Sequence, residues 1–245
     1  EAPALVNVID SRIFATTSSP TLAEGLTFQP GVRVENDCQN CGFTQARING
    51  LDGHYSQVLI DSRPVFSALA GVYGLEQIPS SMIDRVEVVR GGGSALFGAS
   101  AIGGTINIIT KEAMSSSAGI SHDLTSIGVS GALDNNTSLN ASMVTDDGRG
   151  GLFVFGQKRL RDGYDADGDG FTDIPMINSI TVGTRGHLRV NPFSKIRLEY
   201  HGTKELRRGG DRLDLPAHEA LIAEQTEHTN NSGSLSYDGQ SQDGR

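Results

Sequence analysis

The sequence predicts a mixed α/β domain over residues 1–111, followed by antiparallel strands of a transmembrane β-barrel that is incomplete within this chain. Two observations support this fold class. Short runs rich in Val, Ile and Thr, bounded by glycine, recur up to residue 111, and alternation of apolar and polar residues follows from about residue 119. The serine-rich stretch between them, residues 112–118, is expected to be a linker.

Composition narrows the class of protein further. No run of about 18 apolar residues exists, so a transmembrane helix is excluded, whereas barrel strands of roughly ten alternating residues fit the low hydrophobic content of 37%. The net charge of −9 argues against a nucleic-acid partner, which calls for clustered Lys and Arg.

The first domain is expected to begin with a strand at Val6, Val8 and Ile9, followed by a short helix over residues 20–26 that starts at Ser19 or Thr21. A strand from Val32, a polar loop over 35–43, and strands over 46–49 and 57–61 come next. If successive strands run up and down, the loops 35–45 and 63–75 share one end of the domain, and the turn 51–55 lies at the other.

Residues 83–111 hold two β-branched runs, 86–89 and 105–110, separated by six glycines. A glycine-rich loop after a strand can cradle phosphate, but the P-loop and dinucleotide patterns are both absent here. A plain glycine-rich turn in a β protein stays open as an alternative on composition alone.

The segment R-V-E-V-V-R-G-G-G-S-A-L-F-G-A-S-A-I-G-G-T-I-N-I-I-T-K, residues 85–111, resembles the closing signature of the plug domain of TonB-dependent outer-membrane receptors. Upstream stretches at 6–10, 22–34, 58–64 and 78–85 follow in the family's order and spacing. Two positions depart from the family. The segment Ile48-Asn49-Gly50 stands where the family often has I-R-G, and Ser62 stands where glycine usually follows L-I-D.

The resemblance implies a plug domain at 1–111 and the first strands, about six, of a 22-stranded barrel at 119–245. It implies a transporter rather than an enzyme, in the outer membrane of a Gram-negative bacterium and in contact with its lipid. The expected partners are a TonB-like energy-coupling protein and a surface lipoprotein. Cobalamin is the preferred ligand, and haem or a ferric siderophore is the alternative; a secreted calcium-binding β-rich adhesin is a remote one.

The plug loops 36–45 and 65–74 are then expected to face the ligand. The candidate ligand-binding residues are Gln39, Asn40, Phe43, Phe66, Ser67, Leu69 and Tyr73. The second loop is unusually apolar, so Phe66, Leu69 and Tyr73 could instead pack into the domain's own core.

Cys38 and Cys41 have the C-x-x-C spacing of redox sites, zinc sites and small disulfides. Zinc would need two further ligands nearby, and the strand-to-helix setting of a redox site is missing. In an oxidising compartment the pair is expected to form a structural disulfide.

The second part of the chain shows one apolar and one polar face per strand. Leu139, Ala141 and Met143 alternate with polar residues, and the same holds for Ile196, Leu198 and Tyr200. The connections 146–150 and 191–194 are short, whereas 162–179 and 207–226 are long, which is the pattern of short periplasmic turns and long outer loops.

The first long loop carries D-x-D-x-D-G, a calcium-binding pattern. The expected ligands are the carboxylates of Asp165, Asp167, Asp169 and Asp173 and the carbonyl of Phe171, completed by Asp211 and Asp214 from the next long loop. Position 12 is Met176, so the usual bidentate glutamate is missing. The vitamin B12 receptor of the resembled family has a similar acidic loop, which favours cobalamin.

The six histidines are scattered without metal-ligand spacing. A haem receptor could use one as an axial ligand, and His218 in a long outer loop is the best candidate. A solvated or lumen-facing role is expected for each of them.

Overall fold

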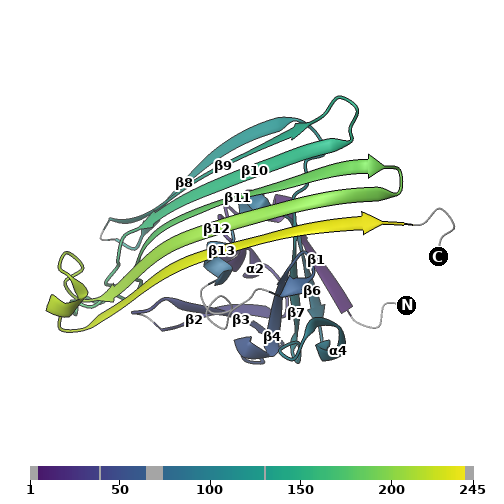
Figure 1. Cartoon of the computed structure of the whole chain (residues 1–245). Coiled ribbons are helices and arrows are strands. Elements are labelled where there is room, and N and C mark those ends of the chain that lie inside the picture. The colour runs from purple at the N-terminus through teal and green to yellow at the C-terminus, as the bar shows by residue number, and fades with distance from the viewer. Residues whose placement is uncertain (1–4, 39, 65–73, 130, 241–245) are drawn as a thin grey trace.

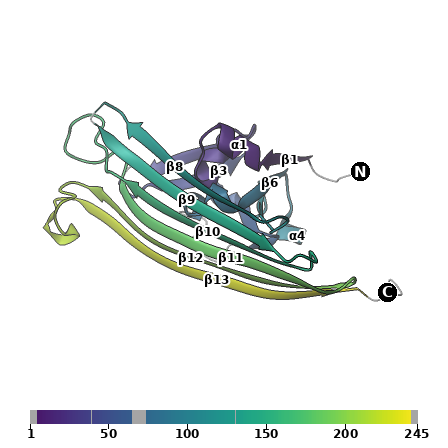
Figure 2. The same cartoon turned by 90° about the horizontal axis from the view of Figure 1, so that it is seen from above.

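The computed structural model describes residues 5–38, 40–64, 74–129 and 131–240. Figures 1 and 2 show a curved sheet of long strands with a smaller domain packed against its concave side. The smaller domain is formed by residues up to Thr110, and the long strands follow it in the chain. No helix within the described ranges is long and apolar enough to span a bilayer.

The smaller domain contains a five-stranded sheet in the order β1-β6-β7-β4-β5. Strands β4 and β7 run parallel, and the other neighbours are antiparallel. The strands are β1 (Leu5–Asp10), β4 (Ser56–Ile60), β5 (Arg63–Pro64), β6 (Ile83–Arg90) and β7 (Gly104–Thr110). The glycine-rich segment therefore joins two neighbouring strands, and Gly104 is required there, because a Cβ would lie 2.4 Å from the Val89 carbonyl oxygen.

Short helical segments and a separate hairpin complete this domain. Thr21 is the N-cap of α2, and its backbone N–H donates to Glu24 Oε2 at 3.1 Å. The elements are α1 (Ser11–Thr16), α2 (Leu22–Leu26), α4 (Ser94–Phe97), the 3₁₀ turns η1 (Gly53–Tyr55) and η2 (Ser80–Met82), and the hairpin strands β2 (Val32–Cys38) and β3 (Phe43–Ile48).

The hairpin corrects one expectation, because most of the predicted polar loop 35–43 is strand. Glu35 lies between Arg33 and Arg47 and forms an ion pair with each, at 2.7 and 2.5 Å. The polar residues of this segment thus satisfy one another across the ladder, so the segment forms a strand without an apolar face. Helix α1, which starts at the N-cap Asp10, was also not expected as a helix.

The long strands form a six-stranded antiparallel sheet in chain order from β8 to β13, as the sequence predicts. They are β8 (Ser117–Ile127), β9 (Ala132–Val144), β10 (Gly150–Arg161), β11 (Met176–Asn191), β12 (Ser194–Gly210) and β13 (Ala223–Gly239). Ser117 and Ala118 already pair with β9, so the strand begins two residues inside the predicted linker. Their small side chains carry no apolar pattern that marks a strand.

The distribution of apolar and polar side chains on this sheet is the reverse of that in a soluble protein. Apolar side chains such as Leu139, Met143, Ile180 and Leu198 face away from the plug domain and are exposed, whereas the polar side chains face it. The short connections 145–149 and 192–193 lie at one end of the sheet, and the long ones 162–175 and 211–222, the second of which contains η3 (Ala217–Glu219), lie at the other together with the β8–β9 connection (Figure 1). This arrangement is typical of a transmembrane barrel wall.

Candidate functional site: the contact between plug domain and barrel wall

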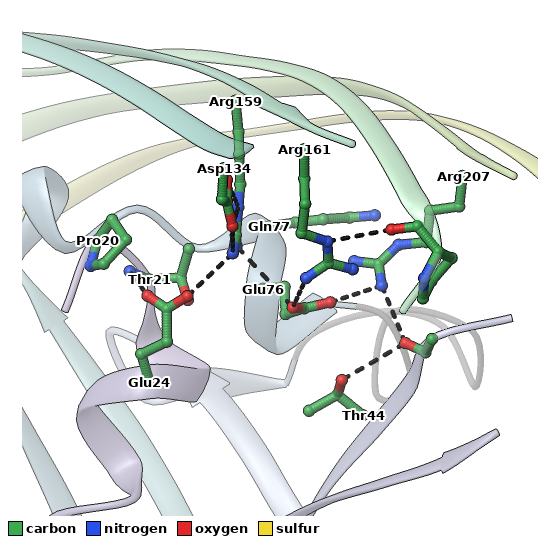
Figure 3. A network of polar contacts seen from close by, with 12 residues as sticks. Pro20, Thr21, Glu24, Thr44, Glu76, Gln77, Asp134, Arg159, Arg161 and Arg207 are labelled. Carbon is green, nitrogen blue, oxygen red and sulfur yellow. Dashed lines mark hydrogen bonds and ion pairs between the residues drawn. The ribbon is translucent and has the colours of Figure 1, made fainter. Parts of the chain in front are cut away.

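A buried ion-pair network joins the plug domain to the barrel strands (Figure 3). Its centre is Glu76, on the helical turn 74–77. Its carboxylate lies 2.5 Å from Arg207 Nη1 on β12, 3.4 Å from Arg161 Nη1 and 3.9 Å from Arg159 Nη1, the last two on β10. One plug carboxylate is thus shared by three barrel arginines.

The arginines are held by further acids. Arg159 pairs with Glu24 of the plug domain at 3.0 Å and with Asp134 of β9 at 2.6 Å. Arg207, which is 1% exposed, pairs with Glu205 at 2.7 Å. Glu205 in turn accepts a hydrogen bond from Gln77 Nε2 at 3.0 Å. Each of these buried charges therefore has an opposite partner, without which its burial would be strongly unfavourable.

The charge state of Glu76 follows from this environment. Burial by itself would raise the pKa of the carboxyl group, but the positive charges of Arg207, Arg161 and Arg159 outweigh burial and lower the pKa to about 2. Glu76 is therefore ionised at every physiological pH.

A second contact lies at the turn between β4 and β5. Asp61 accepts hydrogen bonds from the Thr110 backbone N–H at 3.1 Å and from Thr110 Oγ1 at 2.6 Å, and it pairs with Arg185 of β11 at 3.1 Å. Arg185 continues to Glu199 of β12 at 3.3 Å, and Glu199 to Arg63 at 3.5 Å. Asp61 and Ser62 both have positive φ, 48° and 65°, a conformation that favours glycine.

A third contact fixes the segment between the two domains. Glu112 lies 3.1 Å from His187 Nδ1 and also pairs with Lys195. Burial favours a higher pKa for Glu112, but the hydrogen bond from Lys195 and its charge dominate, so the pKa is lowered.

The hairpin turn with the two cysteines lies near the ends of β12 and β13 where the long loops begin. Cys38 and Cys41 are joined by a disulfide with their Cα atoms 5.4 Å apart. Arg207 Nη1 donates to the Gly42 carbonyl at 2.9 Å, and Glu224 Oε2 lies 3.3 Å from Cys38 Sγ. Gly209 permits this approach, because a Cβ there would lie 1.9 Å from the Asn40 carbonyl oxygen.

The candidate ligand residues are only partly placed by the structure. Asn40 and Phe43 are half-buried at this hairpin, and Phe43 is the first residue of β3 rather than part of a loop. Gln39, Phe66, Ser67, Leu69 and Tyr73 lie outside the described residues. A cavity of about 320 Å³ lies between β5 and the strands β12 and β13, and its polar lining includes Arg63, Glu199, His201 and Asn230.

The acidic loop between β10 and β11 brings together part of the predicted calcium set. Carboxylate oxygens of Asp165, Asp167 and Asp173 lie within 4.8 Å of one another. Hydrogen bonds from the backbone N–H groups of Gly170 and Gly168 lower the pKa of Asp165. Asp169 accepts from the Phe171 N–H at 2.8 Å instead.

The two residues expected to complete the calcium set belong to the next loop. The buried Asp211 accepts from the Ile222 N–H at 2.8 Å, and Asp214 is exposed. His218, the candidate haem ligand, is exposed beside Glu219.

The ion-pair network was missed by the sequence analysis. The signal that could have revealed it is the pair of charged residues two positions apart on the polar face of β10, Arg159 and Arg161, and again on β12, Glu205 and Arg207. Nothing local points to Glu76 as their partner, because it lies 83 or more residues away in the chain.

These features are those of a transmembrane barrel wall whose polar inner face is occupied by a smaller domain. The comparisons with known proteins specify the family. Residues 1–105 match the family model described as TonB-dependent Receptor Plug Domain. The chain belongs to the TonB-dependent outer-membrane receptors, of which it contains the plug domain and six barrel strands.

Individual relatives match part of their length. The vitamin B12 transporter BtuB of Vibrio cholerae is 34% identical over 106 residues, which cover 43% of this chain and 17% of that protein. The iron-regulated outer membrane virulence protein of the same species is 33% identical over 118 residues, 45% of this chain and 18% of that protein.

Solved structures extend the likeness beyond the plug domain. The siderophore receptor PirA from Acinetobacter baumannii superposes with a TM-score of 0.81 at 19% identity, covering 97% of this chain and 38% of that one. A ferric enterobactin receptor from Pseudomonas aeruginosa gives a TM-score of 0.77 at 18% identity and covers 40% of that chain. At this identity the likeness concerns the fold, and the chain spans well under half of these receptors.

Proposed function

We propose that the protein is a TonB-dependent transporter that takes up cobalamin across the outer membrane. The observation that supports the ligand is the plug sequence, which is 34% identical to a vitamin B12 transporter. A ferric chelate is the second candidate, because an iron-regulated outer-membrane protein is 33% identical over a similar stretch. In either case the ligand binds at the end of the barrel that carries the long loops.

The contacts between the plug domain and the barrel wall suit a domain that stays in place at rest and is displaced during transport. Ion pairs dominate its polar contacts with the wall through Glu24, Asp61, Glu76 and Glu112, and such pairs can be replaced by water when the plug shifts. In this proposal a TonB-like protein on the periplasmic side supplies the work that separates them. The chain's own residues hold the resting, closed state.

The test is a binding titration of the full-length receptor with cobalamin, haem and a ferric catecholate, followed by uptake assays in cells with and without the energy-coupling protein. Saturable cobalamin binding and coupling-dependent uptake support the proposal. Binding of the ferric chelate alone would transfer the assignment to the second candidate. Replacing Phe66 or Tyr73 with Ala should weaken binding by about 1–3 kcal/mol if these side chains contact the ligand.

We also propose that the loop between β10 and β11 binds Ca²⁺ through Asp165, Asp167 and Asp173. Three carboxylates this close repel one another unless a cation or water separates them, and hard oxygen ligands suit Ca²⁺. Calcium titration of the wild type should show uptake at millimolar concentration or below, and Asp167→Ala should lose it. Asp147→Ala, in a short turn at the other end, serves as the control.

The disulfide has a direct test. Thiol labelling of the folded, unreduced receptor should modify neither Cys38 nor Cys41, and both should react after reduction. Labelling of both cysteines before reduction would contradict the pairing.

A further inference from the structure

The turn with the two cysteines is held against the barrel wall by hydrogen bonds and close packing. The Cys38 carbonyl oxygen accepts from the Gly42 N–H at 2.9 Å, and the Gly42 carbonyl oxygen accepts from Arg207 Nη1 at 2.9 Å. The turn also packs on Gly209 of β12, which is paired in register with Glu224 of β13. These contacts place the cysteines beside the Glu224 side chain.

Glu224 adds a carboxylate to the two sulfurs. One of its oxygens lies 3.3 Å from Cys38 Sγ, although 186 positions separate the two residues in the chain. Side-chain atoms of Cys38, Cys41 and Glu224 that can bind a metal all lie within 4.8 Å of one another. The sequence brings together only the two sulfurs, and the fold supplies the third group from the wall.

The carboxylate gains no hydrogen bond from the disulfide. A sulfur in a disulfide carries no hydrogen, so Cys38 cannot donate to Glu224 in the oxidised form. Within the described ranges, no basic side chain forms an ion pair with Glu224. Reduction changes this environment, because a thiol can donate to the carboxylate and two thiolates can share a cation with it.

The spacing of the three groups fits a zinc ion. Bonds of about 2.3 Å to sulfur and 2.1 Å to oxygen place neighbouring ligand atoms of a tetrahedral site about 3.5–3.8 Å apart. The Cys38 sulfur and the Glu224 oxygen are already close to this distance. Rotation about the Cα–Cβ bonds can separate the two sulfurs once they are no longer bonded. The Cys41 N–H donates to Cys38 Sγ at 3.2 Å, and such a hydrogen bond stabilises a thiolate.

We propose that the reduced form of the turn binds a thiophilic divalent cation such as Zn²⁺ through Cys38, Cys41 and Glu224, with water as the fourth ligand. Two external thiols first break the S–S bond; each protein sulfur takes up one proton, and the two thiols leave as their own disulfide. The cation then replaces both protons. Because Glu224 belongs to β13, the bound cation ties the plug domain to the wall. The site is independent of the transported ligand.

The experiment measures the Zn²⁺ affinity of the purified full-length receptor by competition with a chromophoric chelator. The receptor is reduced with dithiothreitol and desalted under inert gas, and the oxidised receptor reports zinc bound elsewhere. The reduced wild type should bind one additional equivalent. Glu224→Gln should weaken this binding at least about tenfold, and Cys38→Ser should abolish it. Glu227→Gln, on the opposite face of the same strand, is the matched control and should bind as the wild type does.

Two results would overturn the proposal. One is equal Zn²⁺ binding by the reduced and the oxidised wild type, and the other is wild-type affinity in reduced Glu224→Gln, which would leave the wall out of the site. If Cys38→Ser does not fold, alkylation of the reduced wild type replaces it and should abolish the additional equivalent; an alkylated receptor that keeps it contradicts the proposal. Co²⁺ provides a second readout, because the reduced wild type should show thiolate-to-metal charge-transfer absorption that the oxidised form lacks.

Discussion

The plug domain and the barrel wall bury opposite kinds of side chains. The plug domain has a conventional core, in which Leu22, Leu26, Ile83, Ile106 and other apolar residues are less than 1% exposed. The wall exposes most of its apolar side chains and directs mainly polar ones inward, where Arg159 and Arg207 are nearly inaccessible; Phe153 and Phe155 of β10 also lie inward and join the core of the plug domain. The comparison teaches that the plug domain has an apolar core of its own, whereas its contact with the wall combines buried ion pairs with the apolar packing of Phe153 and Phe155.

Removal of Glu76 should have the largest effect on that position. Glu76→Ala leaves the buried Arg159 and Arg207 and the partly buried Arg161 with one carboxylate fewer, and removing one partner of a buried ion pair typically costs about 3–5 kcal/mol. We expect the plug domain to stay folded and to separate from the wall more readily. The measurement is hydrogen exchange of residues 74–82, with Glu87→Ala as a control that lies outside this network. Unchanged exchange at 74–82 would show that the network is dispensable.

A core truncation tests the other half of the comparison. Ile106→Ala removes a fully buried side chain from β7 and should destabilise the plug domain by about 2–5 kcal/mol. Urea unfolding of the full-length receptor, followed by a probe on β6, reports this change. If the plug domain draws its stability from the wall instead, the transition will not move.

Arginine substitutions on the two faces of β9 test the difference between the lipid-facing and the inward-facing side of the wall. Leu139→Arg places a charge on the lipid face and should destabilise the barrel by about 2–4 kcal/mol. Asn140→Arg should cost much less, because Asn140 faces a cavity of about 300 Å³ that it shares with Asp123. Folding yield into lipid vesicles compares the two, and equal losses would contradict the assignment of faces.

Acid should release the plug domain before it unfolds the core. The pKa of Glu76 is about 2 in the folded receptor and 4.5 when unpaired, so its contribution is complete above about pH 4.5 and is lost as the pH falls toward 2. Exchange at residues 74–82, measured over this range, should rise in the wild type. Glu76→Gln, which is neutral throughout, should lack this component.

The smallest expected effect comes from the turn between β4 and β5. Ser62→Gly relieves a positive φ of 65° and should stabilise the receptor by up to about 1 kcal/mol. A rise in the midpoint of urea unfolding checks it. A fall would mean that the Ser62 hydroxyl, which accepts from Asn107 Nδ2, contributes more than the strain removes.

The features that were predictable from sequence are those with a local period. Alternation at Leu139, Ala141 and Met143 predicted the wall and its faces, and the signature at 85–111 predicted the domain. The hairpin β2–β3 was not predictable, since Glu35 pairs with Arg47, which lies twelve residues away on the other strand. The network around Glu76 was not predictable either, because inward arginines look like solvated lumen residues until the fold supplies their carboxylates.

The length of the segment between the two domains determines how easily a displaced plug domain can return. Strand β7 ends at Thr110 and β8 begins at Ser117, so only residues 111–116 separate them. Such a short tether holds a displaced plug domain within about 20 Å of its seat. Return is then a unimolecular event at an effective concentration in the millimolar range, which no diffusing competitor easily matches. In the proposed transport function, the ion pairs can therefore break while the plug domain still returns to its place in the barrel.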